Sequence, residues 1–222
     1  TEESHLAKVP ENLSFEEAAA IPEAFITAHD AVWTQGSLSA GETLLIHAVG
    51  SGVGLAAFQI AKANGNKVIG TSRTQKKLDE CKDLGLDVAI NTSENPEFAN
   101  EIANNVNVVL DLVGASYFAS NIKSLAQKGR LILVGLVGGR KAEFDMGMAL
   151  GKRLQIIGTT LRARTSEEKA DATASFAREV LPLFDSGEIA PNLDRVFSVE
   201  EIKEAHEYLE SNSSFGKVVI RF

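Results

Sequence analysis

The sequence of 222 residues predicts an α/β fold, a doubly wound six-stranded parallel sheet with flanking helical segments and a C-terminal strand. Two observations support this fold class. Short apolar runs alternate along the chain with amphipathic stretches of helical spacing. The apolar runs lack the two-residue alternation of half-exposed strands, as expected for a parallel sheet that is buried on both faces. Because strands and helices alternate in units of about 20–30 residues, right-handed crossovers are expected on both faces of the sheet.

The elements of this alternation follow in order. The predicted strands are the apolar runs 43–48, 67–71, 87–90, 106–110, 130–134 and 154–160. The helical patterns between them cover 52–63, 75–84, 96–104, 116–126 and 144–152. Gly65, Gly85 and Gly129 fall where helices should end, in the manner of left-handed caps.

Two flanks fall outside the alternation. Residues 14–34 predict two short helices that meet at Pro22. The C-terminal flank predicts a helix over 166–185, a second helix over 199–211 and a last strand over 217–221. We expect both flanks to pack on the sheet or on something outside this chain, because they carry too little apolar surface to fold alone.

Composition excludes several classes of partner. The chain is 44% hydrophobic, with a formal net charge of −8 and a pI of about 5.1, so nucleic acids and anionic membranes are unfavourable partners. No apolar run approaches membrane-spanning length. The single cysteine, Cys81, cannot form an internal disulfide, which fits a reducing compartment, and we expect a cytoplasmic location.

The most informative stretch is HAVGSGVG at 47–54, between a predicted strand and a predicted helix. The helix N-terminus offers unpaired N–H groups and the positive end of the helix dipole, which together bind anions such as a pyrophosphate. Glycines let the backbone approach such a group closely. The strict G-x-G-x-x-G pattern is absent, so the strand–turn–helix context carries the prediction. The alternative is a tight turn that binds nothing.

The end of the next strand suggests which dinucleotide binds. An NAD site usually places an acidic residue there, but residues 67–78 contain neither Asp nor Glu. Ser72 is followed instead by Arg73, Lys76 and Lys77, which are donors for a ribose 2′-phosphate. The pattern favours NADP over NAD, although a solvated basic helix start would have the same composition.

Three further loops follow predicted strand ends, where ligands of such sheets bind. They are Asp111–Gly114, Gly135–Gly139 and 159–162. No catalytic side chain stands out, since Tyr117 and Tyr208 lack the lysine four positions later that a short-chain dehydrogenase needs. No His/Cys cluster suggests zinc, so no metal site is expected. Any chemistry would therefore be hydride transfer supplied by the cofactor.

Five stretches carry a family resemblance that runs nearly from end to end of the chain. They are VPENLSFEEAAAIPEAFITAHDAV (9–32), LLIHAVGSGVGLAAFQIAKANG (44–65), LDLVG (110–114), GRLILVGLVGG (129–139) and FSVEEIKEAHEYLESNSSFGKVVI (197–220). The chain resembles the quinone oxidoreductase branch of the medium-chain dehydrogenase/reductase superfamily. Within it, the chain is most similar to the zeta-crystallin-like and tumour-suppressor-inducible NADPH quinone oxidoreductases. Thr92 departs from the family, which usually has a tyrosine beside the adenosine phosphate.

The resemblance implies a set of cofactor contacts. It places Ser51, Gly52 and Val53 at the pyrophosphate and Ser72, Arg73 and Lys77 around the 2′-phosphate. We also expect Gly54 and Lys76 to bind the cofactor. Gly114, Gly135, Leu136 and Leu161 would line the remaining cleft towards the nicotinamide, and Ser214 would reach the cofactor from the C-terminal loop. Thr27 would stand near the nicotinamide and the substrate.

The resemblance also implies a division of the chain. Residues 1–24 would be a linker or remnant of a preceding domain, 25–161 the dinucleotide-binding Rossmann domain, and 162–222 a segment that packs on the catalytic domain. Family members carry about 110–120 more residues in front, the usual size of one domain. We therefore expect this chain to lack the N-terminal catalytic domain. Family members also dimerise through the edge strand, here 154–160.

The implied function is hydride transfer from NADPH to a quinone or an α,β-unsaturated carbonyl. Three alternatives stay open. The chain could be an NADP(H)-binding module with little independent catalysis, or a crystallin-like protein without enzymatic activity. A methyltransferase is the least favoured alternative, because sheets of that class also normally have an acidic residue at the position near Ser72.

Overall fold

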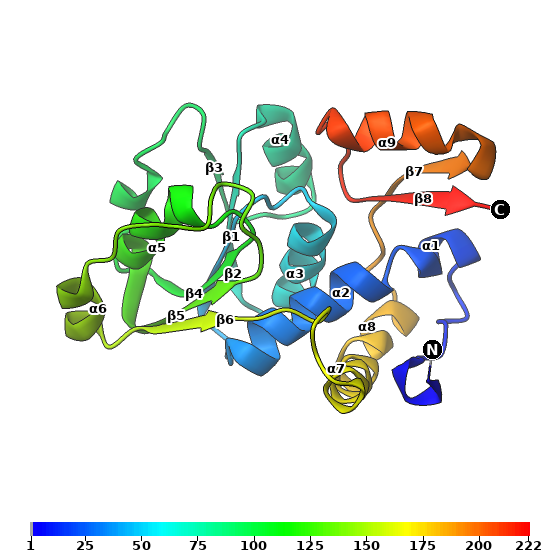
Figure 1. Ribbon diagram of the computed structural model, residues 1–222, viewed down its shortest axis with the longest axis horizontal. Coiled ribbons are helices and arrows are strands. Elements are labelled where there is room, and N and C mark those ends of the chain that lie inside the picture. The colour runs from blue at the N-terminus through cyan, green and yellow to red at the C-terminus, as the bar shows by residue number, and fades with distance from the viewer. Residues whose placement is uncertain (1) are drawn as a thin grey trace.

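A six-stranded parallel sheet forms the centre of the molecule, which a computed structural model describes over residues 2–222 (Figure 1). The strand order is β3-β2-β1-β4-β5-β6, and every neighbouring pair is parallel. This confirms the predicted fold class. The strands are β1 (Thr43–Ile46), β2 (Lys67–Ser72), β3 (Val88–Asn91), β4 (Val106–Asp111), β5 (Leu125–Leu133) and β6 (Gln155–Gly158).

Helices cover both faces of the sheet. The helices of the described residues are α1 (Phe15–Ala19), α2 (Pro22–His29), the π-helix η2 (Asp30–Gln35), α3 (Gly52–Ala63), α4 (Gln75–Asp83), α5 (Phe118–Ser124), α6 (Met146–Lys152), α7 (Ser166–Glu179), α8 (Leu181–Asp185) and α9 (Ile202–Glu210). Of these, α1 and α9 lie beside the C-terminal strands and not on this sheet. Short 3-10 turns occupy Glu3–His5, Phe98–Asn100, Ala115–Tyr117 and Val199–Glu201. None of the helices described over residues 2–222 is long and apolar enough to cross a membrane.

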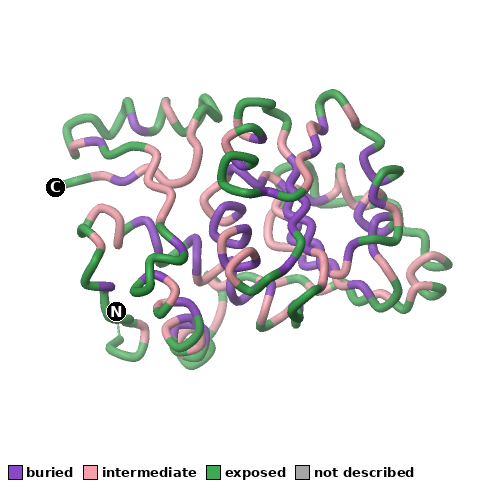
Figure 2. Tube along the Cα trace, turned by 180° about the vertical axis from the view of Figure 1, so that it is seen from behind, coloured by how far each residue is buried: buried purple, intermediate pink, exposed green. Residues whose placement is uncertain are grey.

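The core consists of two apolar clusters, one on each face of the sheet. Leu44 and Ile46 of β1 belong to one cluster, whereas Leu45 between them belongs to the other. Successive side chains of a strand point to opposite faces, so this split is what a sheet buried on both sides requires. The first cluster also takes in Phe176 and Phe184 from α7 and α8, which ties the C-terminal flank to the sheet. Figure 2 shows the buried residues concentrated in the strands and the adjoining helices.

Three sequence predictions of local structure were wrong. Residues 96–104 form only a 3-10 turn and irregular turns, because this Asn-rich segment reaches a left-handed residue at Asn104 (φ 59°) instead of extending a helix. Gly129 lies inside β5, and the positive φ belongs to Lys128 beside it. The helix predicted over 166–185 is broken at Val180, since Pro182 at the start of α8 has no N–H to donate.

The C-terminal part forms a small unit that reaches back to the glycine turn. The predicted last strand is β8 (Lys217–Arg221), which pairs in parallel with an unpredicted strand, β7 (Leu193–Ser198). A backbone bridge joins Ser51 to Gly216 ahead of β8. In Figure 1 this unit and both chain termini lie at the same end of the molecule, away from α6.

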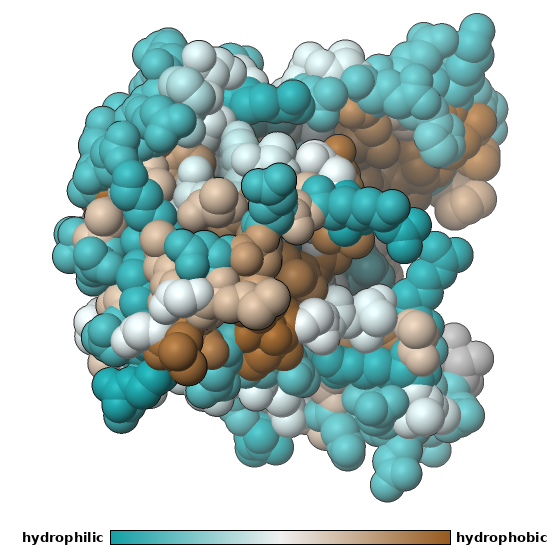
Figure 3. Space-filling view, turned by 60° about the vertical axis from the view of Figure 1, so that its left-hand side comes forward, coloured by the Kyte–Doolittle hydropathy of each residue, from teal (hydrophilic) through white to brown (hydrophobic). Residues whose placement is uncertain are grey.

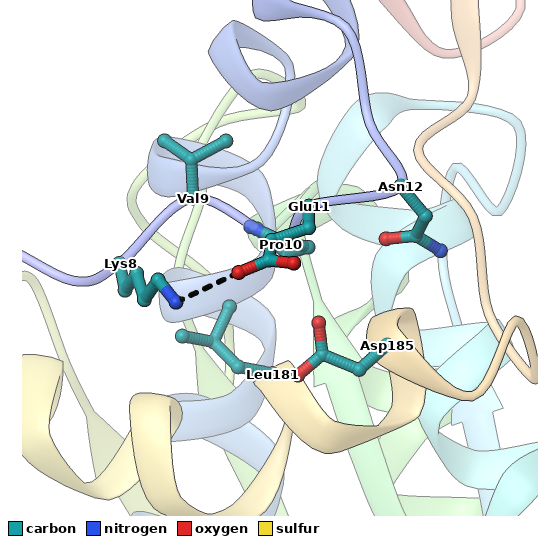
Figure 4. A pocket seen from close by; sticks show the side chains of 7 residues that line it. All are labelled: Lys8, Val9, Pro10, Glu11, Asn12, Leu181 and Asp185. Atoms are coloured by element: carbon teal, nitrogen blue, oxygen red, sulfur yellow. Dashed lines mark hydrogen bonds and ion pairs between the residues drawn. The ribbon is translucent and has the colours of Figure 1, made fainter.

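The N-terminal segment lies on α8. The Asn12 side-chain amide donates a hydrogen bond to the carbonyl of Phe184 at 2.8 Å. Between segment and helix is an open hollow of about 400 Å³, where Lys8 forms an exposed ion pair with Glu11 (Figure 4). The charged residues that line this hollow are Lys8, Glu11 and Asp185, and none of its lining residues belongs to the glycine turn.

Candidate functional site

The HAVGSGVG stretch forms the predicted strand–turn–helix junction. β1 ends at Ile46, and Ser51 caps α3 by accepting a hydrogen bond from the Gly54 N–H at 3.1 Å. A Cβ at Gly54 would lie 2.5 Å from the Ala48 carbonyl oxygen, so only glycine lets the helix pack this closely on the turn. Gly54 therefore serves helix packing, and the turn leaves the N-terminus of α3 beside an open cleft.

That cleft, of about 390 Å³, lies at the carboxyl ends of the strands. It brings together four residues predicted for cofactor binding, Ser51, Ser72, Arg73 and Lys77. Neither Asp nor Glu is among its lining residues in the described part of the chain, which also include Ala48, Gly50, Thr71, Thr74, Val113, Ser116, Tyr117, Val137, Gly138 and Asn212. Among residues 2–222, the charged groups that line it are the two cations Arg73 and Lys77.

Lys77 packs directly against the glycine turn. A Cβ at Gly50 would lie 3.1 Å from both Cβ and Cδ of Lys77, so the lysine stem covers this glycine. Partial burial lowers the pKa of Lys77, and the nearby Asp194 of β7 opposes that shift. Lys76, in contrast, points away, with its side chain 81% exposed and its ammonium 3.8 Å from Glu80. The two adjacent lysines therefore have different environments.

A second lysine reaches the turn from the far end of the chain. A Cβ at Gly52 would lie 2.6 Å from Cδ of Lys217, the first residue of β8. The Gly216 N–H donates to the Gly50 carbonyl at 3.2 Å, and this bond fixes the C-terminal strand beside the turn. Lys77 and Lys217 thus flank the glycine turn from opposite ends of the sequence, next to the positive end of α3.

The loops after β4 and β5 pack tightly on each other. The Gly138 N–H donates to the Val113 carbonyl at 2.7 Å. Gly114 has a φ of +91°, and a Cβ there would lie 3.0 Å from Cδ2 of Leu136. A Cβ at Gly135 would lie 2.5 Å from the Leu112 carbonyl oxygen. The predicted residues Gly114, Gly135 and Leu136 therefore shape these loops and do not line the cleft themselves.

Other predicted site residues do not line this cleft. Val53 packs against the first apolar cluster. Leu161 lines a separate hollow together with Ile26, the neighbour of the half-buried Thr27 in α2. Ser214 is half-buried in the loop before β8. The structure thus brings Ser51, Ser72, Arg73 and Lys77 together at one cleft and leaves Thr27 and Leu161 near a different hollow.

A fully buried polar network supports the loops from below. His47 Nε2 lies 2.6 Å from Asn121 Oδ1, and Nδ1 lies 2.9 Å from the Thr71 hydroxyl. Asn121 in turn donates to Asp111 at 3.0 Å, and Asp111 accepts the N–H of Gly114 at 2.8 Å. Burial lowers the pKa of His47, although Asp111 opposes this shift. His47 is therefore a hydrogen-bonded core residue.

Sequence reasoning missed Lys217 beside the glycine turn and two residues that line the cleft. Tyr117 lines it and donates a hydrogen bond from its hydroxyl to Thr92 Oγ1 at 2.7 Å. The family usually has a tyrosine at position 92, and here the ring of Tyr117, from another loop, lies next to Thr92. Asn212 and Lys217 belong to the C-terminal segment. The sequence SNSSFGK at 211–217, with its small residues before a lysine, is the one signal that could have indicated them. Over residues 2–222, no group of three or more His, Cys, Asp or Glu side chains could hold a metal ion.

Comparison with known proteins places this geometry in a family. The model described as "Zinc-binding dehydrogenase" matches residues 52–178, which run from the start of α3 to the last turn of α7. The chain belongs to this family. More broadly, it is an NAD(P)-binding Rossmann half of the medium-chain dehydrogenase/reductase type, which confirms the superfamily that the sequence resembles.

Relatives of this family align with nearly the whole chain. "Quinone oxidoreductase-like protein 2" of Bos taurus is 29% identical over 99% of this chain and 64% of its own length. "Acryloyl-coenzyme A reductase" of Sulfurisphaera tokodaii is 30% identical over 97% of this chain and 61% of its own length. The chain therefore spans less than two thirds of the length of these relatives.

Solved structures of the family share the fold. A crystal structure of an NAD-dependent alcohol dehydrogenase superposes with a TM-score of 0.85 at 34% identity, over 99% of this chain and 62% of that one. A mycobacterial protein complexed with NADPH superposes with a TM-score of 0.84 at 28% identity, over 96% of this chain and 66% of that one. Both forms of the nicotinamide cofactor thus occur among structural relatives.

Proposed function

We propose that this chain is the cofactor half of an NADPH-dependent oxidoreductase that reduces a quinone or an α,β-unsaturated carbonyl. The observation that carries the proposal is the cleft at the glycine turn. Arg73 and Lys77 are its only charged lining groups, where an NAD site would have an acidic residue. A 2′-phosphate fits this donor set, because charge-assisted hydrogen bonds to Arg and Lys are stronger than neutral ones.

The residues present fit a dinucleotide along the cleft. The capped N-terminus of α3, with Lys217 over Gly52, would hold the pyrophosphate, while Ser72, Arg73 and Lys77 would hold the 2′-phosphate. Tyr117 offers an aromatic edge beside these groups. When bound, NADPH supplies a hydride. The chain's own residues bind and orient it and exclude water from it.

The substrate proposal rests on the relatives and on the composition of the site. Relatives are named for quinone reduction and for acryloyl-coenzyme A reduction, and both substrates have a polarised, electron-poor double bond. The cleft's lining includes neither a carboxylate nor a histidine to move a proton to the substrate. Positioning of the hydride donor is therefore the chain's proposed contribution, with Thr27 of α2 near the substrate.

The test is an absorbance assay of NADPH consumption with 1,4-naphthoquinone and with an enone such as 3-penten-2-one. Turnover with either acceptor, at a higher kcat/KM for NADPH than for NADH, is the expected result. Tight NADPH binding without turnover would support a second candidate, a cofactor-binding module that needs another domain. That candidate is favoured by the chain's coverage of only 61–64% of its relatives.

We also propose that the chain forms a homodimer through β6. This strand is at the edge of the sheet, with β5 as its one neighbour, and Ile156 in it is 38% exposed. In the adjacent α6, Met146 is 74% exposed and Leu150 is 80% exposed. Figure 3 turns this side of the molecule towards the viewer and shows apolar residues gathered on it. Light scattering should give twice the monomer mass of 23.7 kDa, and Ile156→Lys should give the monomer.

Nucleic acid and membranes are not among the proposed partners, and a cytoplasmic location remains our expectation. Cys81 is fully buried in α4, and burial raises its pKa to about 12, so it is an unreactive core thiol.

A further inference from the structure

A second hollow lies beside the loop that follows β6. It has a volume of about 530 Å³ and lies between α2, α7 and this loop, with Pro22, Ile26, Leu161, Arg162 and Lys169 in its wall. Leu161 is the residue expected on the nicotinamide side, and Ile26 precedes Thr27. The hollow therefore adjoins the place where hydride transfer is proposed.

The two arginines of the LRAR sequence at 161–164 have different roles. Arg164 forms a bidentate pair with Asp30 of η2, at 2.8 Å and 2.6 Å, and its side chain is 15% exposed against 4% for Asp30. It also donates to the Thr159 hydroxyl at 2.7 Å. These bonds anchor the loop to η2. Arg162, two residues earlier, is left in the wall of the hollow.

Arg162 and Lys169 make neither an ion pair nor a side-chain hydrogen bond with any residue in the range 2–222. The acidic residue closest along the chain to Lys169 is Glu168, and its carboxylate is held by the capping box of α7, where it accepts from the Thr165 N–H at 2.9 Å. Glu23 is the one carboxylate in the wall of the hollow. In a chain of net charge −8, a hollow lined by two cations and one carboxylate has an excess of positive charge that the chain as a whole lacks.

The same hollow continues into an apolar one. A neighbouring space of about 180 Å³ shares Pro22, Ile26 and Thr173 with it and extends to Phe176 and Leu181. A ligand that spans both would have an apolar part against these side chains and an anionic group at Arg162 and Lys169. A neutral quinone would leave both cations unused.

We propose that the reducible substrate carries a carboxylate or a phosphate, which Arg162 and Lys169 bind next to the nicotinamide side. This inference rests on the proposed function for the identity of the reaction and deepens it by naming a charge on the substrate. The Asp30–Arg164 pair positions the loop, and Arg162 and Lys169 supply the recognition. Arginine suits this task because its planar fork bonds such groups in a bidentate manner.

The test uses saturated product analogues, which bind but cannot accept a hydride. Monomethyl succinate is compared with dimethyl succinate for a carboxylate, and butyryl-phosphopantetheine with butyryl-pantetheine for a phosphate. Calorimetry on this chain, with and without saturating NADPH, gives each Kd. The anionic member of one pair should bind at least about tenfold tighter, a difference of about 1.4 kcal/mol. Which pair shows it identifies the anionic group.

The double variant Arg162→Ala, Lys169→Ala should remove this preference, while Lys203→Ala, an exposed lysine on α9, should keep it. Equal binding of both members in both pairs, no binding of either anionic member, or a preference that survives in the double variant would overturn the inference. Failure of NADPH to bind would instead count against the proposed function, because the analogue pairs are also measured without the cofactor.

Discussion

Lys77 and Gly50 are in direct contact across the cleft: the lysine stem occupies the space next to the glycine, 3.1 Å from where a side chain would begin. This contact aligns the start of α4 with the glycine turn, although the two residues are 27 positions apart in the sequence. The ammonium of Lys77 is thereby kept at the wall of the cleft together with Arg73. The position of the glycine turn beside this cationic wall is the basis of the cofactor proposal.

Removal of Arg73 and Lys77 should change cofactor choice. In the double variant Arg73→Ala, Lys77→Ala, the Kd for NADPH should rise at least about tenfold, since two charge-assisted contacts to the 2′-phosphate are lost. The Kd for NADH should stay nearly unchanged. Lys76→Ala is the matched control, because Lys76 is 81% exposed and faces Glu80. Equal losses for both cofactors would refute the 2′-phosphate assignment.

Lys217 should matter equally for both cofactors. Its stem covers Gly52 at the N-terminus of α3, where the pyrophosphate common to NADPH and NADH would bind. We expect Lys217→Ala to raise both Kd values by a similar factor of at least about ten, the loss of one charge-assisted hydrogen bond of about 1.5–3 kcal/mol. Lys203→Ala on α9 serves as control. A change confined to NADPH would place Lys217 at the 2′-phosphate instead.

Gly54 should be intolerant of any side chain. A Cβ there would lie 2.5 Å from the Ala48 carbonyl and 2.7 Å from the Val49 carbonyl, both backbone atoms that cannot move freely. Gly54→Ala should therefore lower the free energy of unfolding by about 1–3 kcal/mol in urea denaturation. Gly151→Ala in α6, where a Cβ would meet open space, should be neutral or stabilising. Similar values for the two variants would contradict this packing.

Stability should fall as the pH drops below about 6.5. Burial lowers the pKa of His47 from its usual 6.5, so the unfolded chain takes up a proton at a pH where the folded chain does not. The unfolded state then binds more protons, and unfolding becomes easier as the pH falls. The lowered pKa values of Glu42 and Asp87 act only below their usual 4.5 and 3.8.

Urea denaturation at pH 7.5, 6.5 and 5.5 measures this dependence. His47→Gln keeps one donor and one acceptor for Asn121 and Thr71, and it should flatten the dependence over this range. A wild-type protein that is as stable at pH 5.5 as at pH 7.5 would show that His47 is not held neutral in the fold.

The sequence was sufficient for the sheet and for the glycine turn because those signals are local. The apolar runs of β1, β2 and β4 and the turn at 47–54 lie within short windows, and their predicted boundaries are within two residues of the observed ones. The helix predicted over 96–104 was wrong because two local signals disagreed. The apolar residues have helical spacing, but the Asn-rich composition favours turns.

The rest of the site depends on contacts between distant parts of the chain. Lys217 reaches Gly52 through a strand whose partner, β7, has no strong periodic pattern of its own. Tyr117 meets Thr92 across two loops, which residue spacing cannot foresee. Lys76 and Lys77 are adjacent residues of the same type, so the sequence does not distinguish them. The orientation of α4 about its axis directs Lys77 to the cleft and Lys76 to solvent.

The most direct test of the account is a fluorescence titration of the wild-type chain with NADPH and, separately, with NADH. We predict that NADPH binds at least about tenfold more tightly, a difference of about 1.4 kcal/mol. That result would assign the cleft at 47–54 to the dinucleotide and Arg73 and Lys77 to its 2′-phosphate. Equal affinities, or tighter binding of NADH, would contradict the central claim.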